Sequence, residues 1–409
     1  MSGEYLSELN IRLRSLAIFR TLLDDPVIAA LGRYMENAGT GKTSELVSAY
    51  ADFVSALYAT EKRTLAGYIQ SIVGGDENAY IRMIGRGASP WPEMEADVAA
   101  ELEILQAVAD LTPEILREGL GWVGYLPKFP VKHIELADSY RERCANIGKY
   151  GYGIYAKYHT FYIDPAHRIV PVKNPDAIRL SSLVDYKREQ QIILDNTNAL
   201  LEGKPAANIL LTGDAGTGKS STVKAVVNEL YVRGLRILEV RKEQLHQLPG
   251  ILDELNTNPL KFILFIDDLS FQKDDDNFSA LKAILEGSVS AKSRNVVIYA
   301  TSNRRHLVKE TFSDRDGDDI HRNDTMQEII SLSERFGIQI TFQKPDKKTY
   351  LNIVRHLARE RGLDYAPEQL DLLAERFVLN RGGRSARAAT QFIDSLEAAG
   401  KSRNMPEIE

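Results

Sequence analysis

The stretch Ile209–Ser221, which reads ILLTGDAGTGKSS, decides the fold of this 409-residue chain. A short apolar run opens onto a glycine-rich loop, and apolar residues at helical spacing follow it. Gly213 and Gly218 frame the four residues before Lys219, which completes the phosphate-binding pattern G-x-x-x-x-G-K-S/T between a strand and a helix. The residues predicted to bind a nucleoside triphosphate are Gly213, Asp214, Ala215, Gly216, Thr217, Gly218, Lys219, Ser220 and Ser221.

The residue types in this loop suit a triphosphate for physical reasons. Glycines let backbone N–H groups approach phosphate oxygens without a Cβ in the way. The helix that follows directs its positive end at the same anion. The ammonium of Lys219 is long enough to reach the β- and γ-phosphates, and the hydroxyl of Ser220 suits a Mg²⁺ ion.

Length and composition place the chain among multidomain globular proteins. It is 44% hydrophobic and 26% charged, and its length predicts two or three domains. A formal net charge of −6 argues against a dedicated nucleic-acid binder. The one cysteine, Cys144, excludes an internal disulfide and a cysteine-based zinc site. The N-terminus lacks the basic and apolar blocks of a signal peptide, and no apolar run is long enough to cross a bilayer, so we expect a cytoplasmic protein without a membrane partner.

Hydrophobic periodicity predicts three domains. Residues 1–179 show helical spacing and are expected to form a mainly helical N-terminal domain, with an aromatic β-hairpin near residues 150–172. Residues 180–345 alternate helices with nearly continuous apolar strands, which predicts an α/β domain with a parallel sheet covered on both faces. Residues 346–409 are expected to form a small helical domain. The strands expected after the phosphate loop are Arg236–Val240, Phe262–Ile266, Val296–Ala300 and Ile338–Phe342.

Polar side chains follow two of these strands. Asp267 and Asp268 come directly after an apolar run, and ligands gather at this end of a parallel sheet. We expect Asp267 to hold Mg²⁺ together with Ser220, and Asp268 to activate the attacking water. Asn303 ends the next strand and is expected to position that water, with Thr301 as the alternative; Asn303 as a helix N-cap is the competing structural interpretation.

The order of these parts resembles the AAA+ ATPases. The phosphate loop, the Asp-Asp strand and the Asn-tipped strand are followed by SLSERFG from Ser331. The resemblance implies that the last domain, residues 346–409, is a helical lid, and it contains GGR at residues 382–384. The similarity covers roughly residues 180–405. The phrases FILFIDDLSF from Phe262 and IYATSNRRHL from Ile298 resemble one bacterial AAA+ family of unknown function. Within AAA+, the motifs are similar to those of the replication-initiator branch.

The resemblance implies a homo-oligomer with ATP sites between subunits. Arg335 corresponds to an arginine finger that acts on the neighbour's γ-phosphate, and Arg384 to a lid arginine that contacts phosphate within its own chain, with Arg387 as the alternative. Most AAA+ proteins have Glu where this chain has Asp268, whose side chain has a shorter reach.

Two functions follow from this pattern. The first is a Mg²⁺-dependent AAA+ ATPase that uses its nucleotide state to remodel or load a partner macromolecule. The alternative is a nucleotide-gated binding module with weak hydrolysis, which presents its N-terminal domain to DNA or to a protein. The aromatic and basic residues near positions 150–172 could stack on bases or simply pack a hairpin.

Overall fold

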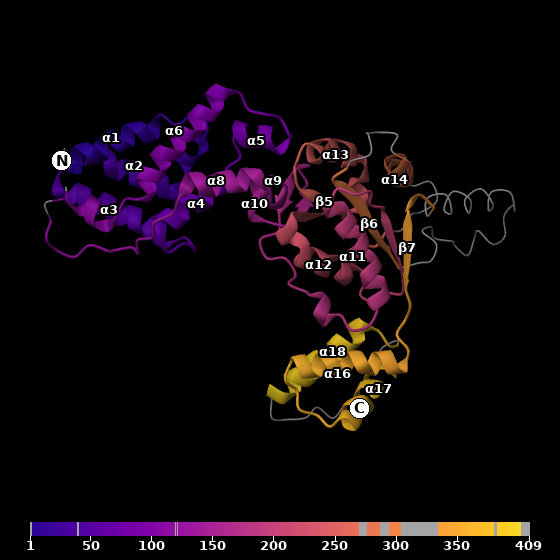
Figure 1. The fold of residues 1–409 in the computed structure, drawn as a ribbon. Helices are drawn as coiled ribbons and strands as arrows, with labels where there is room; N and C mark the ends of the chain where they lie inside the picture. Colours follow the sequence, from indigo (N-terminus) through magenta and orange to yellow (C-terminus); the bar gives the residue numbers. More distant parts are fainter. Residues whose placement is uncertain are drawn as a thin grey trace. The chain divides into compact units, whose positions relative to one another are not determined.

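The computed structural model describes residues 2–38, 41–118, 120, 122–269, 276–286, 294–303, 334–379 and 383–401. The chain divides into two compact units, Met1–Lys157 and Tyr158–Glu409 (Figure 1). Ser331–Ser333 and Gly382 of the AAA+-like motifs lie outside the described residues, as does the segment after Asn303 that would follow it as a capped helix.

The first unit is helical, as its sequence predicts, and its helices enclose one hydrophobic core. A short 3-10 turn, η1 (Arg20–Asp24), links the first two helices, and Asp25 caps the second by accepting hydrogen bonds from the N–H groups of Val27 and Ile28. The helices are α1 (Ser2–Arg14), α2 (Pro26–Asn37), α3 (Thr43–Tyr58), α4 (Leu65–Gly75), α5 (Ala79–Gly85), α6 (Pro92–Ala109), α7 (Pro113–Arg117), α8 (Leu136–Ala145), α9 (Ile147–Tyr150) and α10 (Ile154–Lys157).

A buried carboxylate organises the start of this unit. Glu101 of α6 is buried, and its two oxygens accept hydrogen bonds from the backbone N–H groups of Ala17, Ile18 and Phe19 at 2.7–3.1 Å. These donors belong to the turn that follows α1 and have no helical partner. Glu101 therefore satisfies a turn that would otherwise bury unpaired donors.

The second unit contains a seven-stranded sheet in the order β2-β1-β4-β5-β6-β3-β7. All neighbouring strands are parallel except the pair β1 and β2. The expected parallel sheet is confirmed, and each predicted strand is present within about one or two residues of its expected ends. The strands are β1 (Thr160–Ile163), β2 (Ile169–Pro171), β3 (Ile209–Gly213), β4 (Leu235–Glu239), β5 (Lys261–Ile266), β6 (Val296–Ser302) and β7 (Ile338–Phe342).

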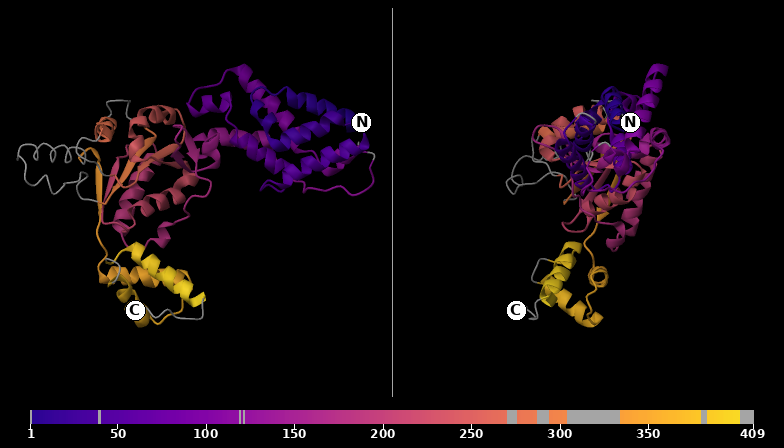
Figure 2. Two further views of the ribbon diagram at one scale, coloured as in Figure 1. Left: turned by 180° about the vertical axis from the view of Figure 1, so that it is seen from behind. Right: turned by 90° about the vertical axis from the view of Figure 1, so that its left-hand side faces the viewer.

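Helices pack against the sheet, and three more helices follow its last strand in the sequence. Helix α12 begins at Lys219, directly after the phosphate loop. Residues of α11, α12 and β3 share one hydrophobic core. The other elements are η2 (Leu180–Ser182), α11 (Lys187–Leu201), α12 (Lys219–Leu230), η3 (Tyr231–Arg233), η4 (Lys242–Gln247), α13 (Leu248–Asn256), α14 (Asp276–Glu286), α16 (Lys347–Glu360), α17 (Pro367–Leu379) and α18 (Ala386–Lys401). The last three helices share a core of their own, which is the expected helical lid (Figure 2).

The aromatic hairpin differs from the prediction. A hairpin is present as β1 and β2, but residues 147–150 and 154–157 are helical. Its assignment to the N-terminal domain is wrong, because β1 pairs in parallel with β4 and extends the sheet of the second unit. The buried Phe161 and Ile163 explain the pairing, since their side chains need a hydrophobic face to cover them. Among the described residues, no helix is long and apolar enough to cross a membrane.

Candidate nucleotide site

The predicted site residues meet at one edge of the parallel sheet. The strand order puts β6 between β5 and β3, so the carboxyl ends of these three strands are neighbours. The phosphate loop follows β3, the two aspartates follow β5, and Asn303 follows β6. Residues separated by about 90 positions in the sequence thus converge because parallel strands end at the same edge.

The phosphate loop has the backbone geometry that its glycines permit. Gly213 has φ 136°, and a Cβ at this position would lie 2.0 Å from the carbonyl oxygen of Phe342 on the neighbouring strand β7. Gly218 has φ 94°, which is the left-handed conformation that opens α12. No other residue type fits position 213 without moving the edge of the sheet.

Lys219 is a buried cation without an anionic partner among the described residues. The residue is only 4% exposed. Its Nζ donates hydrogen bonds to the carbonyl oxygens of Gly213 and Asp214 at 2.8 Å and to Oδ1 of Asn303 at 3.0 Å. Burial lowers the pKa of Lys219, although nearby aspartates act in the opposite direction. Because a buried charge is normally paired with an opposite charge, we expect this ammonium to bind an anion.

Ser220 and Asp267 form a pair of adjacent oxygens. The hydroxyl of Ser220 donates to Oδ1 of Asp267 at 2.6 Å, and the buried hydroxyl of Thr301 donates to the same oxygen at 2.6 Å. Thr301 also accepts the backbone N–H of Asp268 at 3.0 Å. Thr301, the predicted alternative to Asn303, is thus hydrogen-bonded to both aspartates and fixes their positions.

Asp268 and Asn303 are linked directly. The amide of Asn303 donates to Oδ1 of Asp268 at 2.7 Å, while its carbonyl oxygen accepts the ammonium of Lys219. Asp268 has φ 54°, an uncommon backbone conformation for a residue other than glycine. Strained backbone of this kind is typical of functional sites.

A cavity of about 850 Å³ opens over these residues. Its polar lining comes from the phosphate loop, from Ala215 to Thr222, and from Asp267, Asp268, Thr301 and Asn303. Its lining also includes the apolar or aromatic side chains of Val184, Tyr186, Ile353 and Leu357. Its volume is typical of pockets that hold small ligands. Tyr186 is fixed by a hydrogen bond from its hydroxyl to the carbonyl oxygen of Gln343 at 2.5 Å.

The two lid arginines have different environments. Arg384 donates two hydrogen bonds to Glu375 at 2.9 and 2.7 Å and does not line the cavity. Arg387 lines the cavity, and its backbone N–H donates to the carbonyl oxygen of Gly216 at 3.2 Å. A Cβ at Gly216 would lie 3.0 Å from Cβ of Arg387, so the lid contacts the phosphate loop here. The geometry favours Arg387, the alternative to the predicted Arg384.

Arg335 also lies outside the cavity of its own chain. Its guanidinium forms an ion pair with Glu286 of α14. Arg361, the C-cap residue of α16, lines the cavity and pairs with Asp394 and Glu397 of α18, and no motif in the sequence identifies it. Its only signal was a basic residue at the end of a predicted helix, which is too common to single out.

The donor set of this site fits a Mg²⁺ ion. Mg²⁺ in nucleotide enzymes takes one or two protein oxygens together with phosphate oxygens and water. The adjacent oxygens of Ser220 and Asp267 are of this kind. In the described ranges of the chain, no cluster of three His, Cys, Asp or Glu residues forms a metal cage by itself.

Comparison with known proteins gives one family and several distant folds. The profile of a family described as "Protein of unknown function (DUF815)" matches residues 156–400. No curated protein sequence matches the chain.

Solved structures similar to this chain include three with low identity. The Thermotoga maritima RuvB Holliday junction branch migration motor has TM-score 0.38 and 14% identity over 57% of this chain and 68% of its own. PCH-2 of C. elegans has TM-score 0.39 and 17% identity over 55% and 65%. AMPPCP-bound DnaA from Aquifex aeolicus has TM-score 0.38 and 19% identity over 56% and 66%. The chain thus spans about two thirds of the length of each.

Proposed function

The chain belongs to the family described as "Protein of unknown function (DUF815)", and we propose that it is a Mg²⁺-dependent ATPase of the AAA+ type whose active sites are shared between subunits. Its nucleotide state would serve to remodel or load a partner macromolecule, either a protein or DNA. The observation that carries the proposal is the buried Lys219, which donates hydrogen bonds to three neutral oxygens and lines a cavity together with two aspartates.

Triphosphate binding follows from the loop. Backbone N–H groups from Ala215 to Ser221 and the start of α12 supply donors and a positive dipole end. Lys219 would exchange its carbonyl partners for phosphate oxygens, which are stronger acceptors because they are charged. The preference for adenine rests on the AAA+ resemblance, and the side chains of Val184 and Tyr186 in the cavity lining are available to pack against a base.

Hydrolysis requires a metal site, a base and a positioned water. Ser220 and Asp267 would hold Mg²⁺, which supplies charge neutralisation at the β- and γ-phosphates. Asp268 would accept a proton from the attacking water, and Asn303, already bonded to Asp268, would orient both. Arg387 faces the cavity from the lid and would link its position to the bound nucleotide.

The oligomeric part of the proposal concerns Arg335. Arg335 does not line the cavity of its own chain, so a role in catalysis needs the site of a neighbouring subunit. Its ion pair with Glu286 is partly exposed and would be exchanged for contacts to the γ-phosphate. A guanidinium at that point stabilises the charge that develops during phosphoryl transfer.

A second function, a nucleotide-gated binding module with weak hydrolysis, is favoured by one observation. The carboxylate of Asp268 has a short side chain and is already bonded to Asn303. A base held in this way reaches less far toward a water than a glutamate would. Such a protein would bind ATP tightly, turn it over slowly, and present a binding surface only in one nucleotide state.

The test is the steady-state ATPase rate as a function of protein concentration, with particle mass followed in parallel and with Mg²⁺ present or replaced by EDTA. A specific activity that rises as oligomers form, and that requires Mg²⁺, would support a shared site. A constant rate from a monomer would contradict the role of Arg335. ATP binding without turnover, together with salt-dependent retention on single-stranded DNA, would favour the binding module.

A further inference from the structure

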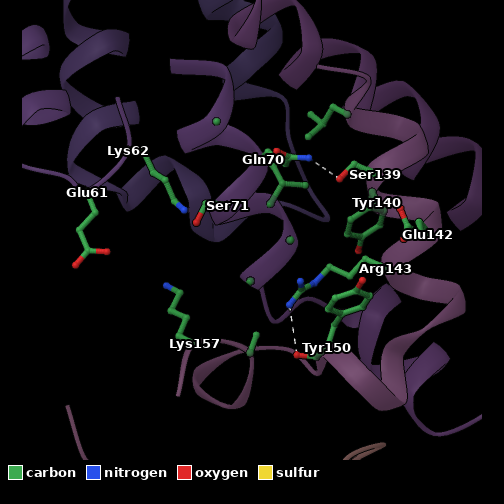
Figure 3. A pocket seen from close by; sticks show the side chains of 16 residues that line it. Glu61, Lys62, Gln70, Ser71, Ser139, Tyr140, Glu142, Arg143, Tyr150 and Lys157 are labelled. Carbon is green, nitrogen blue, oxygen red and sulfur yellow. Dashed lines mark hydrogen bonds between the residues drawn. The ribbon is translucent and has the colours of Figure 1, made fainter. Parts of the chain in front are cut away.

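A second cavity, of about 540 Å³, lies within the helical unit (Figure 3). Its walls come from α4, α8, the turn at residues 61–62, and the segment from Tyr150 to Lys157. Polar side chains predominate among the wall residues, including Gln70, Ser71 and Ser139. All of these residues belong to one compact unit, so the cavity does not depend on the nucleotide site.

Three cations from separate segments converge on this cavity, and we call it the cationic pocket. Lys62, Arg143 and Lys157 line it, and Figure 3 shows the nitrogen ends of their side chains facing the same space. Glu61 and Glu142 line the same cavity, yet no ion pair joins either carboxylate to these cations in the described part of the chain. Three cations against two carboxylates leave the lining with an excess of positive charge, so we expect the cavity to attract an anion.

Arg143 supplies a second, independent observation. Its Nη2 donates to the carbonyl oxygen of Gly151 at 3.2 Å, and its guanidinium lies 5.1 Å from the centre of the Tyr150 ring. Burial lowers the pKa of Arg143. Its Nε is buried and has no hydrogen-bond partner among the residues that the structure describes. Because buried donors are normally satisfied, Arg143 keeps a hydrogen-bonding capacity that the described residues do not use.

Two glycines of α4, Gly74 and Gly75, leave room for the side chains of Arg143 and Lys157. A Cβ at Gly74 would lie 3.3 Å from Cδ of Arg143, and one at Gly75 would lie 3.3 Å from Cε of Lys157. Both distances are tighter than an ordinary carbon contact. The stems of the two side chains therefore lie directly against the helix, which directs their charged ends into the pocket.

We propose that the cationic pocket binds the phosphate group of a small phosphorylated molecule. A tetrahedral dianion can accept hydrogen bonds from three directions at once, whereas a planar carboxylate is satisfied by one arginine fork. Gln70, Ser71 and Ser139 are suited to a polar remainder of the ligand. This site goes beyond the ATPase function, since it shares no residue with the nucleotide cavity.

The experiment is lysine acetylation of the full-length chain, quantified residue by residue by mass spectrometry, during titration with inorganic phosphate at constant ionic strength. Because each lysine is followed separately, phosphate at the nucleotide site does not interfere. We expect saturable protection of Lys62 and Lys157 in the millimolar range. Lys128 and Lys132, which are exposed lysines of the same unit outside the pocket, serve as internal controls.

Single substitutions of exposed lysines test the site without risk to the fold. Lys157→Ala should weaken the phosphate protection of Lys62 by at least about tenfold, and Lys62→Ala should do the same for Lys157. Lys132→Ala, with the same change of charge, should leave both unchanged. Equal protection of all four lysines, or none at Lys62 and Lys157, would overturn the proposal. Protection by single-stranded DNA but not by phosphate would also overturn it, in favour of a nucleic-acid surface.

Discussion

The two cavities of this protein use the same chemistry and are built in different ways. Each presents cations that have no carboxylate partner among the described residues: Lys219 in the nucleotide site, and Lys62, Arg143 and Lys157 in the cationic pocket. The nucleotide site takes its donors from one continuous loop and two strand ends. The cationic pocket takes its three cations from segments spread over about 95 residues, between positions 62 and 157.

This difference explains why only one of the two cavities is visible in the sequence. A phosphate loop needs a fixed spacing because its own backbone binds the ligand. A pocket between helices needs only that side chains meet in space, so many spacings serve equally well. If the two cavities are also separate in energy, a substitution in one of them should leave ligand binding in the other unchanged.

Removal of the proposed base should affect turnover far more than binding. Asp268→Asn keeps the size of the side chain but removes its ability to accept a proton. We expect the ATPase rate constant to fall by about 10²–10⁴-fold, which is typical of a lost general base. The affinity for ATP should change little, which equilibrium binding of a fluorescent ATP analogue would measure.

Asp268→Glu is the matched control, because it restores the carboxylate with a longer reach. Turnover equal to or above that of the natural protein would support the position of the base. If Asp268→Asn retains full activity, the water is activated elsewhere and the assignment fails.

Loss of the unpaired cation in the loop should affect binding itself. Lys219→Ala removes the ammonium that donates to the phosphate loop carbonyls, and we expect ATP affinity to fall by about 100-fold. The phosphate protection of Lys62 and Lys157 should be unaffected, because those lysines belong to the other unit. Calorimetric titration with ATP, beside the acetylation assay, measures both.

Lys224→Ala is the control for this change. Lys224 lies on the same helix, and its ammonium pairs with Glu239 at 2.8 Å rather than entering the cavity. Its loss should leave ATP affinity within about twofold. A similar decrease in both variants would show that the effect is one of general charge.

The sequence predicted most of the nucleotide site and the order of its parts. The phosphate loop, Asp267, Asp268 and Asn303 were predicted because each lies at a strand end, and strand ends of a parallel sheet share one edge. The supporting role of Thr301 was not predicted, since a buried hydroxyl under two carboxylates has no spacing signature. The choice between Arg384 and Arg387 depends on which side of one helix end meets the loop, and sequence position does not determine this.

The hairpin shows a similar limit for the fold. Aromatic residues crowded between glycines predicted a β-hairpin near residues 150–172, and β1 and β2 are present. Which sheet they join depends on the pairing of β1 with β4, about 75 residues later in the chain. This long-range pairing depends on the burial of Phe161 and Ile163 against a core that is distant in the sequence. The spacing of residues within the hairpin does not predict which strand it will pair with.

The helical unit should lose stability without affecting the nucleotide site. Glu101→Gln removes the negative charge that accepts hydrogen bonds from Ala17, Ile18 and Phe19, and an amide offers only one oxygen to these donors. We expect a loss of about 2 kcal/mol, typical of hydrogen bonds to a buried charge. Amide hydrogen exchange at residues 17–19 measures it, and ATP affinity should remain unchanged.

Glu103→Gln is the control, because Glu103 lies on the same helix and is exposed. Equal acceleration of exchange in the two variants would contradict the structural role of Glu101. A decrease in ATP affinity in Glu101→Gln alone would show instead that the helical unit supports the nucleotide site.

The smallest effect concerns the lid and separates the two arginines. Arg387→Ala removes a guanidinium that lines the nucleotide cavity, and we expect ATP affinity to fall by about tenfold. Arg384→Ala breaks a bidentate pair with Glu375 on the lid itself, so it should reduce lid stability slightly and leave ATP affinity nearly unchanged. Titration calorimetry with a non-hydrolysable ATP analogue compares the two. If Arg384→Ala weakens binding more than Arg387→Ala, then bound nucleotide draws Arg384 away from Glu375, and the lid must rearrange when the site is filled.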